Sequence, residues 1–333
     1  MARLSILLLT VLAAGAISAP LLAAPLKKGV RALVAFEHSP FPFEGKIPGK
    51  DEPFFDVVEN GRKGHTSPRG GIYWQDETYS DRRVLLNIPR GFDAARPGVI
   101  VVFFHGNKSI LERDVVRRQQ VPQQVARAGL NAVLVAPQLA VDALDSTAGR
   151  FYLPGFFAKF MDEAARELAR LAGDARLRAT FEALPVVIVA YSGGYTPAAW
   201  AAHHGGLGDR LKAVLLFDAL YGDLDKFAAW VERRAPTVFF SAHSKSAREP
   251  NTALQARLAG LGLDVKSDLP AAFAPGQVVF YAASEEVLHG DFLTKAWMDD
   301  PVEGVLRKLG PVLRPPTKTA AKAKAKPKPR KAE

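Results

Sequence analysis

Six apolar runs recur along the chain, and this repetition constrains the fold more than any other feature. The runs are residues 99–104, 131–137, 185–190, 212–220, 237–243 and 277–283. The first of them, VIVVFF, has no polar residue, which is typical of a strand buried on both faces. Segments with helical spacing separate the runs, for example MDEAARELARLAG (161–173). Strands that alternate with helices imply right-handed crossovers. The sequence therefore predicts an α/β fold, a doubly wound, mostly parallel sheet with helices on both faces.

The residues outside this alternation divide the chain. Residues 1–24 begin with a short basic start at Arg3 followed by a run without charge, which predicts a secretory signal peptide or an uncleaved membrane anchor. Residues 25–81 are rich in Pro, Gly and aromatic side chains and have poor periodicity, so we expect an irregular covering segment with short strands. The sheet domain is predicted over 82–312, and a disordered Lys/Ala/Pro-rich tail over 313–333.

The formal net charge of +10 is concentrated in the tail, where residues 317–333 carry six Lys and one Arg against one Glu. The body is therefore only mildly basic. A tail of this kind is expected to contact polyanions, through counterion release, or anionic surfaces of the cell envelope. The alternative is a solubilising tail without a partner. No specific binding of nucleic acid is predicted. With the signal peptide, the expected location is periplasmic or secreted, or anchored through an uncleaved N-terminus.

The composition also excludes several kinds of chemistry. The chain has no cysteine, which rules out disulfides, cysteine nucleophiles and thiolate metal sites. No group of His, Asp and Glu has the spacing of metal ligands, and no Gly-rich segment has the spacing of a phosphate loop. We therefore expect neither a metal nor a cofactor.

One serine lies at the end of an apolar run. The sequence Ala190-Tyr191-Ser192-Gly193-Gly194 follows the strand predicted at 185–190, and helical spacing resumes within four residues. The order small-x-Ser-x-small between a strand and a helix is typical of a nucleophile elbow, a sharp turn that exposes the serine. Small residues at 190 and 194 fit the expectation that these two positions nearly touch. The alternative is an ordinary structural turn.

Two further strand ends carry residues that suit the same chemistry. His289 follows the last predicted strand, where its imidazole would be the general base, with His243 as the rival. Asp218 follows the run 212–220 and would orient that imidazole, although a role in capping its own loop is the alternative.

The segment Phe104-His105-Gly106-Asn107 ends another strand and is expected to help bind an oxyanion. The backbone N–H of Asn107 is the first choice for the second oxyanion donor and that of Lys108 the second choice, beside the N–H of Gly193. His105 itself is expected to be a buried structural residue.

Over residues 82–310 the chain resembles the α/β-hydrolase superfamily. The resemblance rests on a strand followed by His-Gly, a strand–A-x-S-x-G–helix segment, a strand ending in Asp and a last strand followed by His. It departs from the usual pattern at Ala190, where glycine is common, and in lacking an acid after the strand at 237–243. The resemblance implies an α/β-hydrolase fold and a Ser192-His289-Asp218 triad.

The predicted function is that of an exported serine hydrolase that cleaves an ester through an acyl-enzyme. Alternatives are an amidase or peptidase acting on cell-envelope material, and a non-catalytic envelope-binding protein on a hydrolase scaffold. Tyr191, Phe151 and Phe156 are the predicted substrate contacts, because an aromatic insertion before the elbow suits apolar acyl or aryl groups. The alternative for these phenylalanines is packing of the insertion onto the core. The substrate would be a small or polymer-borne acyl compound.

Overall fold

The main feature of the protein is a nine-stranded sheet with the strand order β1-β5-β7-β6-β8-β9-β10-β12-β11. The structure is a computed structural model that describes residues 25–233 and 236–313, so the predicted signal peptide and nearly all of the predicted tail lie outside it. The pairs β1/β5 and β5/β7 are antiparallel, and every other neighbouring pair is parallel. The strands are β1 Val30–Ala35, β5 Arg83–Ile88, β6 Val99–Phe104, β7 Ala132–Pro137, β8 Val186–Tyr191, β9 Leu211–Phe217, β10 Val238–His243, β11 Val265–Lys266 and β12 Val278–Ala282.

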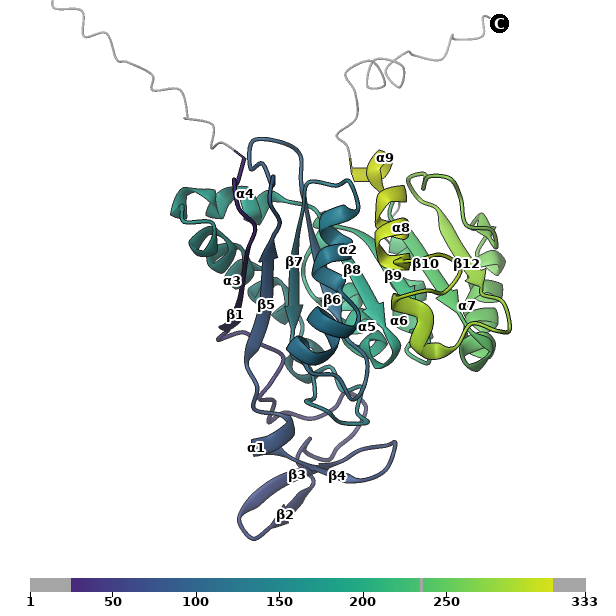
Figure 1. Ribbon diagram of the computed structural model, residues 1–333. Coiled ribbons are helices and arrows are strands. Elements are labelled where there is room, and N and C mark those ends of the chain that lie inside the picture. The colour runs from purple at the N-terminus through teal and green to yellow at the C-terminus, as the bar shows by residue number, and fades with distance from the viewer. Residues whose placement is uncertain (1–24, 234–235, 314–333) are drawn as a thin grey trace, which may run out of the picture.

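Helices cover both faces of this sheet, as predicted (Figure 1). The α-helices are α1 Gln75–Thr78, α2 Val121–Arg127, α3 Phe156–Leu171, α4 Arg178–Ala183, α5 Tyr195–His204, α6 Leu224–Arg233, α7 Arg248–Gly260, α8 Pro301–Lys308 and α9 Gly310–Leu313. Short helical turns are η2 Gly149–Tyr152, η3 Ala175–Leu177, η4 Ser192–Gly194, η5 Gly208–Arg210, η6 Lys245–Ala247 and η7 His289–Leu293, and η1 Leu111–Arg118 is a π-helix.

The side chains of each central strand alternate between two separate hydrophobic clusters. In β6, Ile100 and Val102 face the cluster that includes residues of α3, α5, α6 and α7. Val101 and Phe103 of the same strand face the cluster that includes residues of α2 and α8. All six residues of β6 are buried, which explains why the sequence of this strand is a continuous apolar run rather than an alternating one.

The N-terminal part of the chain differs from its prediction. β1 lies within the segment predicted to be an irregular covering, yet it pairs with β5 over its whole length and forms one edge of the main sheet. The sheet therefore begins well before residue 82. Short strands were expected in this segment, but the prediction did not assign β1 to the main sheet, because its residues, VRALVA, are half-buried at an edge and form only a short apolar pattern.

The residues between β1 and β5, which we call the cover (residues 36–81), lie beyond the carboxyl ends of the parallel strands (Figure 1). The cover contains a separate three-stranded sheet of β2 Val57–Glu59, β3 Arg62–Thr66 and β4 Ile72–Trp74, followed by α1. Its own aromatic side chains hold it to the domain. Phe41, Phe54 and Tyr79 are fully or almost fully buried and lie in ring contact with one another.

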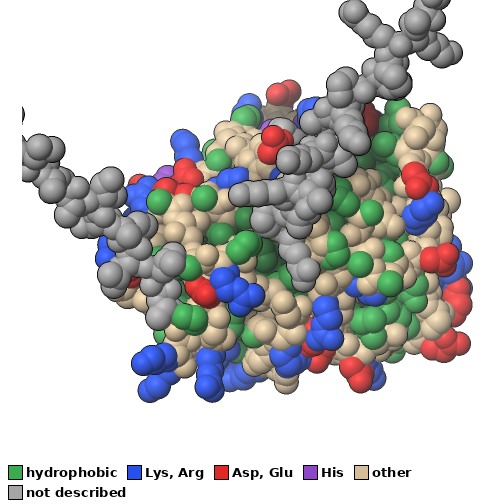
Figure 2. All heavy atoms as spheres, turned by 90° about the horizontal axis from the view of Figure 1, so that it is seen from above, with side chains coloured by type: hydrophobic (Ala, Val, Ile, Leu, Met, Phe, Trp, Pro, Cys, Tyr) green, Lys and Arg blue, Asp and Glu red, His purple; other side chains and the backbone are tan. Residues whose placement is uncertain are grey.

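The two ends of the described chain lie on the opposite side of the molecule from the cover (Figure 1). The Leu26 N–H donates to the Phe92 carbonyl over 2.9 Å, and Leu313 lines a cleft that also contains Arg96. Figure 2 looks onto this side, where basic, acidic and hydrophobic side chains are interspersed. None of the helices within residues 25–233 and 236–313 has the length and apolar character that a membrane crossing requires.

Candidate active site

Ser192 lies at a sharp turn between β8 and α5, and its backbone has φ +52°. This left-handed conformation is strained for a residue with a side chain, and such strain is found mostly at functional sites. Space for the turn comes from glycines on both sides of it. A Cβ atom added at Gly106 would lie 2.8 Å from the Ser192 Cβ, and one added at Gly194 would collide with the carbonyl oxygen of Phe104.

The glycine at 194 is thus required by a different neighbour from the one predicted. The small residues at 190 and 194 predict that these two positions crowd each other. Instead, the atoms nearest to Gly194 belong to the backbone of Phe104 and His105 at the end of the adjacent strand β6. Ala190 pairs with Phe104 and is fully buried, and its methyl group is accommodated in the core.

The structure brings the three predicted catalytic side chains together. The imidazole of His289 has its Nε2 2.8 Å from the Ser192 Oγ and its Nδ1 2.6 Å from the Asp218 Oδ2. Both nitrogens are therefore in use at once, which fixes the orientation of the ring. The ring also stacks on Tyr191, with centroids 5.0 Å apart, and the Tyr191 hydroxyl donates to the His289 carbonyl over 3.1 Å.

Asp218 is completely buried at the end of β9 and is held by neighbouring donors. The Ser244 N–H donates to its Oδ1 and the Ser244 hydroxyl to its Oδ2, each over 2.8 Å. Burial by itself would raise the pKa of Asp218, but the hydrogen bonds from His289 and Ser244 outweigh it and hold the pKa below its ordinary value. Asp218 is thus an ionised, fixed partner for the imidazole.

Two polar residues around this carboxylate were not found from the sequence. Ser244 follows β10, in the loop where the sequence has no acidic residue. It does not take the place of the acid, but donates two hydrogen bonds to Asp218 from that loop. The Tyr221 hydroxyl donates to the Asp218 Oδ2 over 3.2 Å and is 3.4 Å from the His289 Nδ1. Serine and tyrosine are common in loops, so neither position gave a signal that set it apart.

The other histidines examined as candidates lie elsewhere. His243, the rival for the general base, is buried and its Nδ1 donates to the Ser244 carbonyl over 3.1 Å. His105 is buried as expected, with its Nδ1 donating to the Gly106 carbonyl and its Nε2 accepting from the Leu139 N–H over 2.9 Å. Burial lowers the pKa of His105 to about 4, so this imidazole is neutral near neutral pH.

The backbone N–H groups expected to bind an oxyanion differ in their availability. The N–H of Lys108 donates to the Ala143 carbonyl over 2.8 Å and is occupied. Among the described residues, the N–H of Asn107 has no hydrogen-bond partner. Gly193 lies in the first turn of η4, where backbone N–H groups have no partner within the helix. The Asn107 side chain packs directly over Gly193, where an added Cβ would collide with it. Of the two candidate oxyanion donors that follow β6, the N–H of Asn107 is available to a ligand and the N–H of Lys108 is not.

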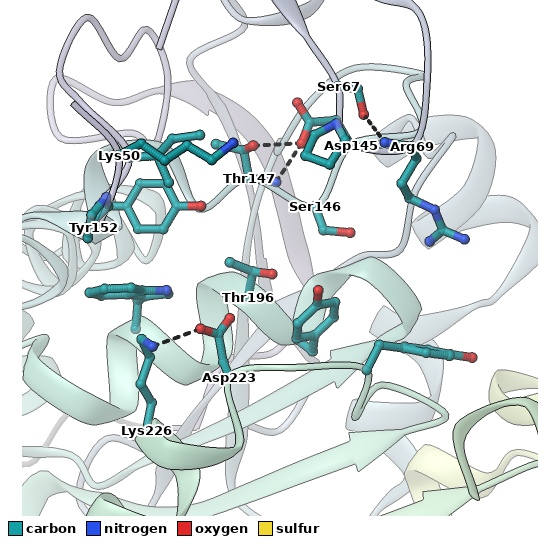
Figure 3. A pocket seen from close by; sticks show the side chains of 16 residues that line it. Lys50, Ser67, Arg69, Asp145, Ser146, Thr147, Tyr152, Thr196, Asp223 and Lys226 are labelled. Carbon is teal, nitrogen blue, oxygen red and sulfur yellow. Dashed lines mark hydrogen bonds and ion pairs between the residues drawn. The ribbon is translucent and has the colours of Figure 1, made fainter. Parts of the chain in front are cut away.

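A pocket of about 510 Å³ opens beside these groups. Its floor comes from α5 and the start of α6, with Thr196, Asp223 and Lys226, and its roof from the cover and the 145–152 loop (Figure 3). Ser192 is not among its lining residues. Ser146 and Tyr221 connect the pocket to the site, because the Ser146 Oγ is 2.7 Å from a Cβ added at Gly193 and Tyr221 touches Asp218.

The predicted aromatic substrate contacts do not line this pocket. Phe151 is fully buried against Phe104 and Phe157, and Phe156 packs under the Arg150 guanidinium. These phenylalanines pack the insertion onto the core, which is the alternative to substrate contact given above. Tyr191 contacts His289 instead of lining the pocket, whose aromatic lining residues are Tyr152, Tyr195, Trp200 and Tyr221.

Comparisons with known proteins give structural similarities only. No family model and no curated protein matches the sequence. Among solved structures, an S-formylglutathione hydrolase from Agrobacterium tumefaciens is 13% identical, with 76% of this chain and 98% of that chain covered and a TM-score of 0.43. A feruloyl esterase module from Clostridium thermocellum is 12% identical (81% and 97% covered, TM-score 0.42). A poly(3-hydroxybutyrate) depolymerase from Bordetella parapertussis is 15% identical (82% and 96% covered, TM-score 0.38). Identities this low do not identify a substrate.

The architecture confirms the predicted fold. The mostly parallel sheet is covered on both faces, and Ser192 lies at a strained strand-to-helix turn. An acidic residue follows β9 and a histidine follows the last strand, in the chain order Ser, Asp, His. These features together make up the α/β-hydrolase fold.

Proposed function

We propose that this protein is an exported serine hydrolase that cleaves a carboxylic ester through an acyl-enzyme intermediate. One observation carries the proposal: His289 bridges Ser192 and Asp218 with its two ring nitrogens, over 2.8 and 2.6 Å. A structural turn would not need a strained serine aimed at an imidazole whose other nitrogen is held by a buried carboxylate.

The proposed reaction follows from these positions. The Ser192 Oγ attacks the ester carbonyl while the His289 Nε2 takes its proton, and the Asp218 carboxylate stabilises the imidazolium that forms. The backbone N–H groups of Gly193 and Asn107 bind the negative oxygen of the tetrahedral intermediate. His289 then returns the proton to the departing alcohol. Water, activated by the same imidazole, hydrolyses the acyl-enzyme and restores Ser192.

A covalent probe and an ester substrate test this proposal. A fluorophosphonate probe is expected to label the wild-type protein and not Ser192→Ala. Short-chain para-nitrophenyl esters should be turned over by the wild type and lost in the same variant. Ser246→Ala serves as a control, because Ser246 is a neighbouring hydroxyl bonded to Ser244 and Tyr221 and not to the histidine. Equal labelling of wild type and Ser192→Ala would refute the nucleophile.

Export and the role of the tail are separate parts of the proposal. They rest on the sequence of residues 1–24 and 314–333, both outside the described residues. We expect the mature protein in the periplasm or the medium. We also expect salt-sensitive binding to anionic envelope material that is lost when 317–333 is deleted. Fractionation of cells with the full chain and with the deletion measures both, and envelope association that persists without the tail would exclude it as the cause.

A further inference from the structure

Of the charged side chains that line the pocket, the carboxylates have partners within the protein and two of the cations do not. Asp145 accepts from the Tyr79 hydroxyl over 2.5 Å, from the Thr147 N–H over 2.8 Å and from the Thr147 hydroxyl over 2.6 Å. Asp223 is bound by Lys226, with the Nζ 3.0 Å from its Oδ1. Both carboxylates that line the pocket are therefore satisfied from within the protein, and neither is left to attract a cation.

Two of the cations that line the pocket have no such partner. Among the described residues, no carboxylate lies within ion-pair distance of Arg69 or Lys50, although both line the pocket. Lys226, the third cation, is occupied by Asp223 and also lies over the Trp200 ring, 4.4 Å from its centroid. The pocket thus presents an unbalanced positive charge whose two sources, Arg69 and Lys50, both belong to the cover.

Arg69 is held close to the groups that would bind the oxyanion. Its backbone N–H donates to the Ser67 hydroxyl, which in turn donates to the Leu144 carbonyl over 2.7 Å. The turn that carries Arg69 is thus fixed to the residue that directly precedes the 145–152 loop. With the Asn107 amide oriented to satisfy its neighbours, its oxygen accepts from the Arg69 guanidinium over 3.3 Å. One side chain, Asn107, therefore separates Arg69 from Gly193. In Figure 3 the guanidinium extends away from Asp145 and lies on the side of the pocket opposite Lys50.

We propose that the pocket selects esters that carry an anionic group, with Arg69 as the specificity-determining residue and Lys50 as a second positive charge. The inference rests on the proposed ester hydrolysis and names its substrate class. A guanidinium binds a carboxylate or phosphate through two parallel hydrogen bonds, and only one guanidinium N–H of Arg69 has a partner among the described residues. The anionic group is recognised and not altered: the bond that breaks is the ester bond, and water supplies the hydroxyl of the released acid.

The test compares matched anionic and neutral esters. The first pair carries the charge on the acyl side: the mono-para-nitrophenyl ester of adipic acid and para-nitrophenyl hexanoate. The second pair carries it on the alcohol side: the acetate esters of para-hydroxybenzoate and of para-hydroxybenzamide. For each pair the readout is the ratio of kcat/KM for the anionic ester to kcat/KM for the neutral one. Any difference in the intrinsic reactivity of the esters is the same for every variant and cancels between them.

In Arg69→Gln this ratio is expected to fall about tenfold in at least one pair, as expected when a charge-assisted hydrogen bond is lost. Arg69→Lys should retain part of the ratio, since it keeps the charge and loses the bidentate geometry. Lys50→Gln should lower the ratio by less, and added salt should lower it in the wild type. Arg96→Gln is the matched control: Arg96 is an exposed arginine that lines a different cleft on the opposite side.

The outcomes separate this inference from the function on which it rests. A ratio that is unchanged in Arg69→Gln for both pairs overturns the inference, as does an equal fall in Arg96→Gln. A fall in one pair alone supports it and assigns the anion to the acyl or the alcohol side. Labelling by the fluorophosphonate probe is measured on each variant. Wild-type protein that is neither labelled nor active on any ester refutes the hydrolase itself.

Discussion

The candidate catalytic residues at the strand ends, which we call the sheet side, differ from the cover side in how completely their charged groups are paired. On the sheet side, the Asp218 carboxylate accepts from Ser244, Tyr221 and His289, which lie in the loops after β10, β9 and β12. On the cover side, Arg69 and Lys50 line the pocket without a carboxylate partner among the described residues. The sheet side is fixed by its own hydrogen bonds, and the cover side keeps unpaired charge.

This difference assigns separate tasks to the two regions. Groups that must act in one geometry gain from a fully satisfied buried network, which holds them without help from a ligand. A group that is to recognise a ligand has to stay unpaired until the ligand arrives. We infer that changes in paired groups alter catalysis or folding, whereas changes in the unpaired cations of the cover alter selectivity. Each prediction below tests one side of this contrast.

The largest effect is expected from Asp218→Asn. An amide at this position cannot stabilise the imidazolium and holds the wrong tautomer of His289, so kcat/KM for a para-nitrophenyl ester should fall about 10⁴-fold. Steady-state kinetics measure the loss, and circular dichroism checks that the fold is kept. Asp264→Asn is the control, because Asp264 is exposed and pairs only with Lys266. A fall of less than tenfold in Asp218→Asn would contradict the role of the carboxylate.

Gly194→Ala tests the close approach of the turn to β6. The added methyl group would collide with the Phe104 carbonyl, and because strand β6 is buried the backbone has little room to yield. We expect a loss of about 3 kcal/mol in the free energy of unfolding, measured by urea denaturation. The matched change Gly260→Ala, in α7 with no atom near the new Cβ, should be neutral or slightly stabilising. Equal stability of the two variants would show that the turn has more room than the structure gives it.

His105 should make the free energy of unfolding decrease in mild acid. Its pKa is lowered from 6.5 to about 4 by burial, so below pH 6.5 the unfolded chain takes up a proton that the folded protein does not. Stability from this group is present at neutral pH and is lost as the pH falls toward the lower value. By linkage the loss is about 2 kcal/mol between pH 7 and pH 5.

The measurement is the pH dependence of the unfolding free energy in the wild type and in His105→Gln. The variant is expected to have a lower unfolding free energy at neutral pH and a smaller change of that free energy between pH 7 and pH 5. A slope as steep as that of the wild type would mean that His105 is not the group responsible.

The smallest effect is expected on the cover side, from Tyr79→Phe. The change removes the hydroxyl that donates to Asp145 over 2.5 Å and leaves that buried carboxylate short of one donor. A loss of about 1 to 2 kcal/mol in unfolding free energy is expected. Tyr281→Phe gives the comparison, because no hydrogen bond to its hydroxyl occurs within the described residues. If the two variants are equally stable, the cover is not held by this bond.

The sheet side could be predicted from the sequence because its signals are local. A buried parallel strand is a continuous apolar run, and the residue after it has a known place at the carboxyl edge of the sheet. Ser192, Asp218 and His289 are therefore predicted from strand ends, from chain order and from the small residues around Ser192. Their distances were not predictable, because they depend on the loops that follow the strands.

The cover side could not be predicted for the same physical reason. Arg69 lies in a Pro/Gly-rich turn without periodicity, and only tertiary packing places it beside Asn107. Phe151 and Phe156 illustrate the opposite error, since an aromatic-rich segment gives no sign of which side chains face the core. Composition indicates that the insertion is apolar, but it does not distinguish side chains that line a pocket from side chains packed in the interior.

The position of the chain ends has a practical consequence. Leu26 and α9 both lie on the side of the domain away from the cover and the pocket (Figure 1). A bead, a sensor surface or a fused partner joined at Leu26 or Leu313 would therefore hold the protein with its pocket turned outward. Substrates too large to diffuse past an obstructing support, such as particles or polymer films, could then be presented to an immobilised layer of this protein without blocking its entrance.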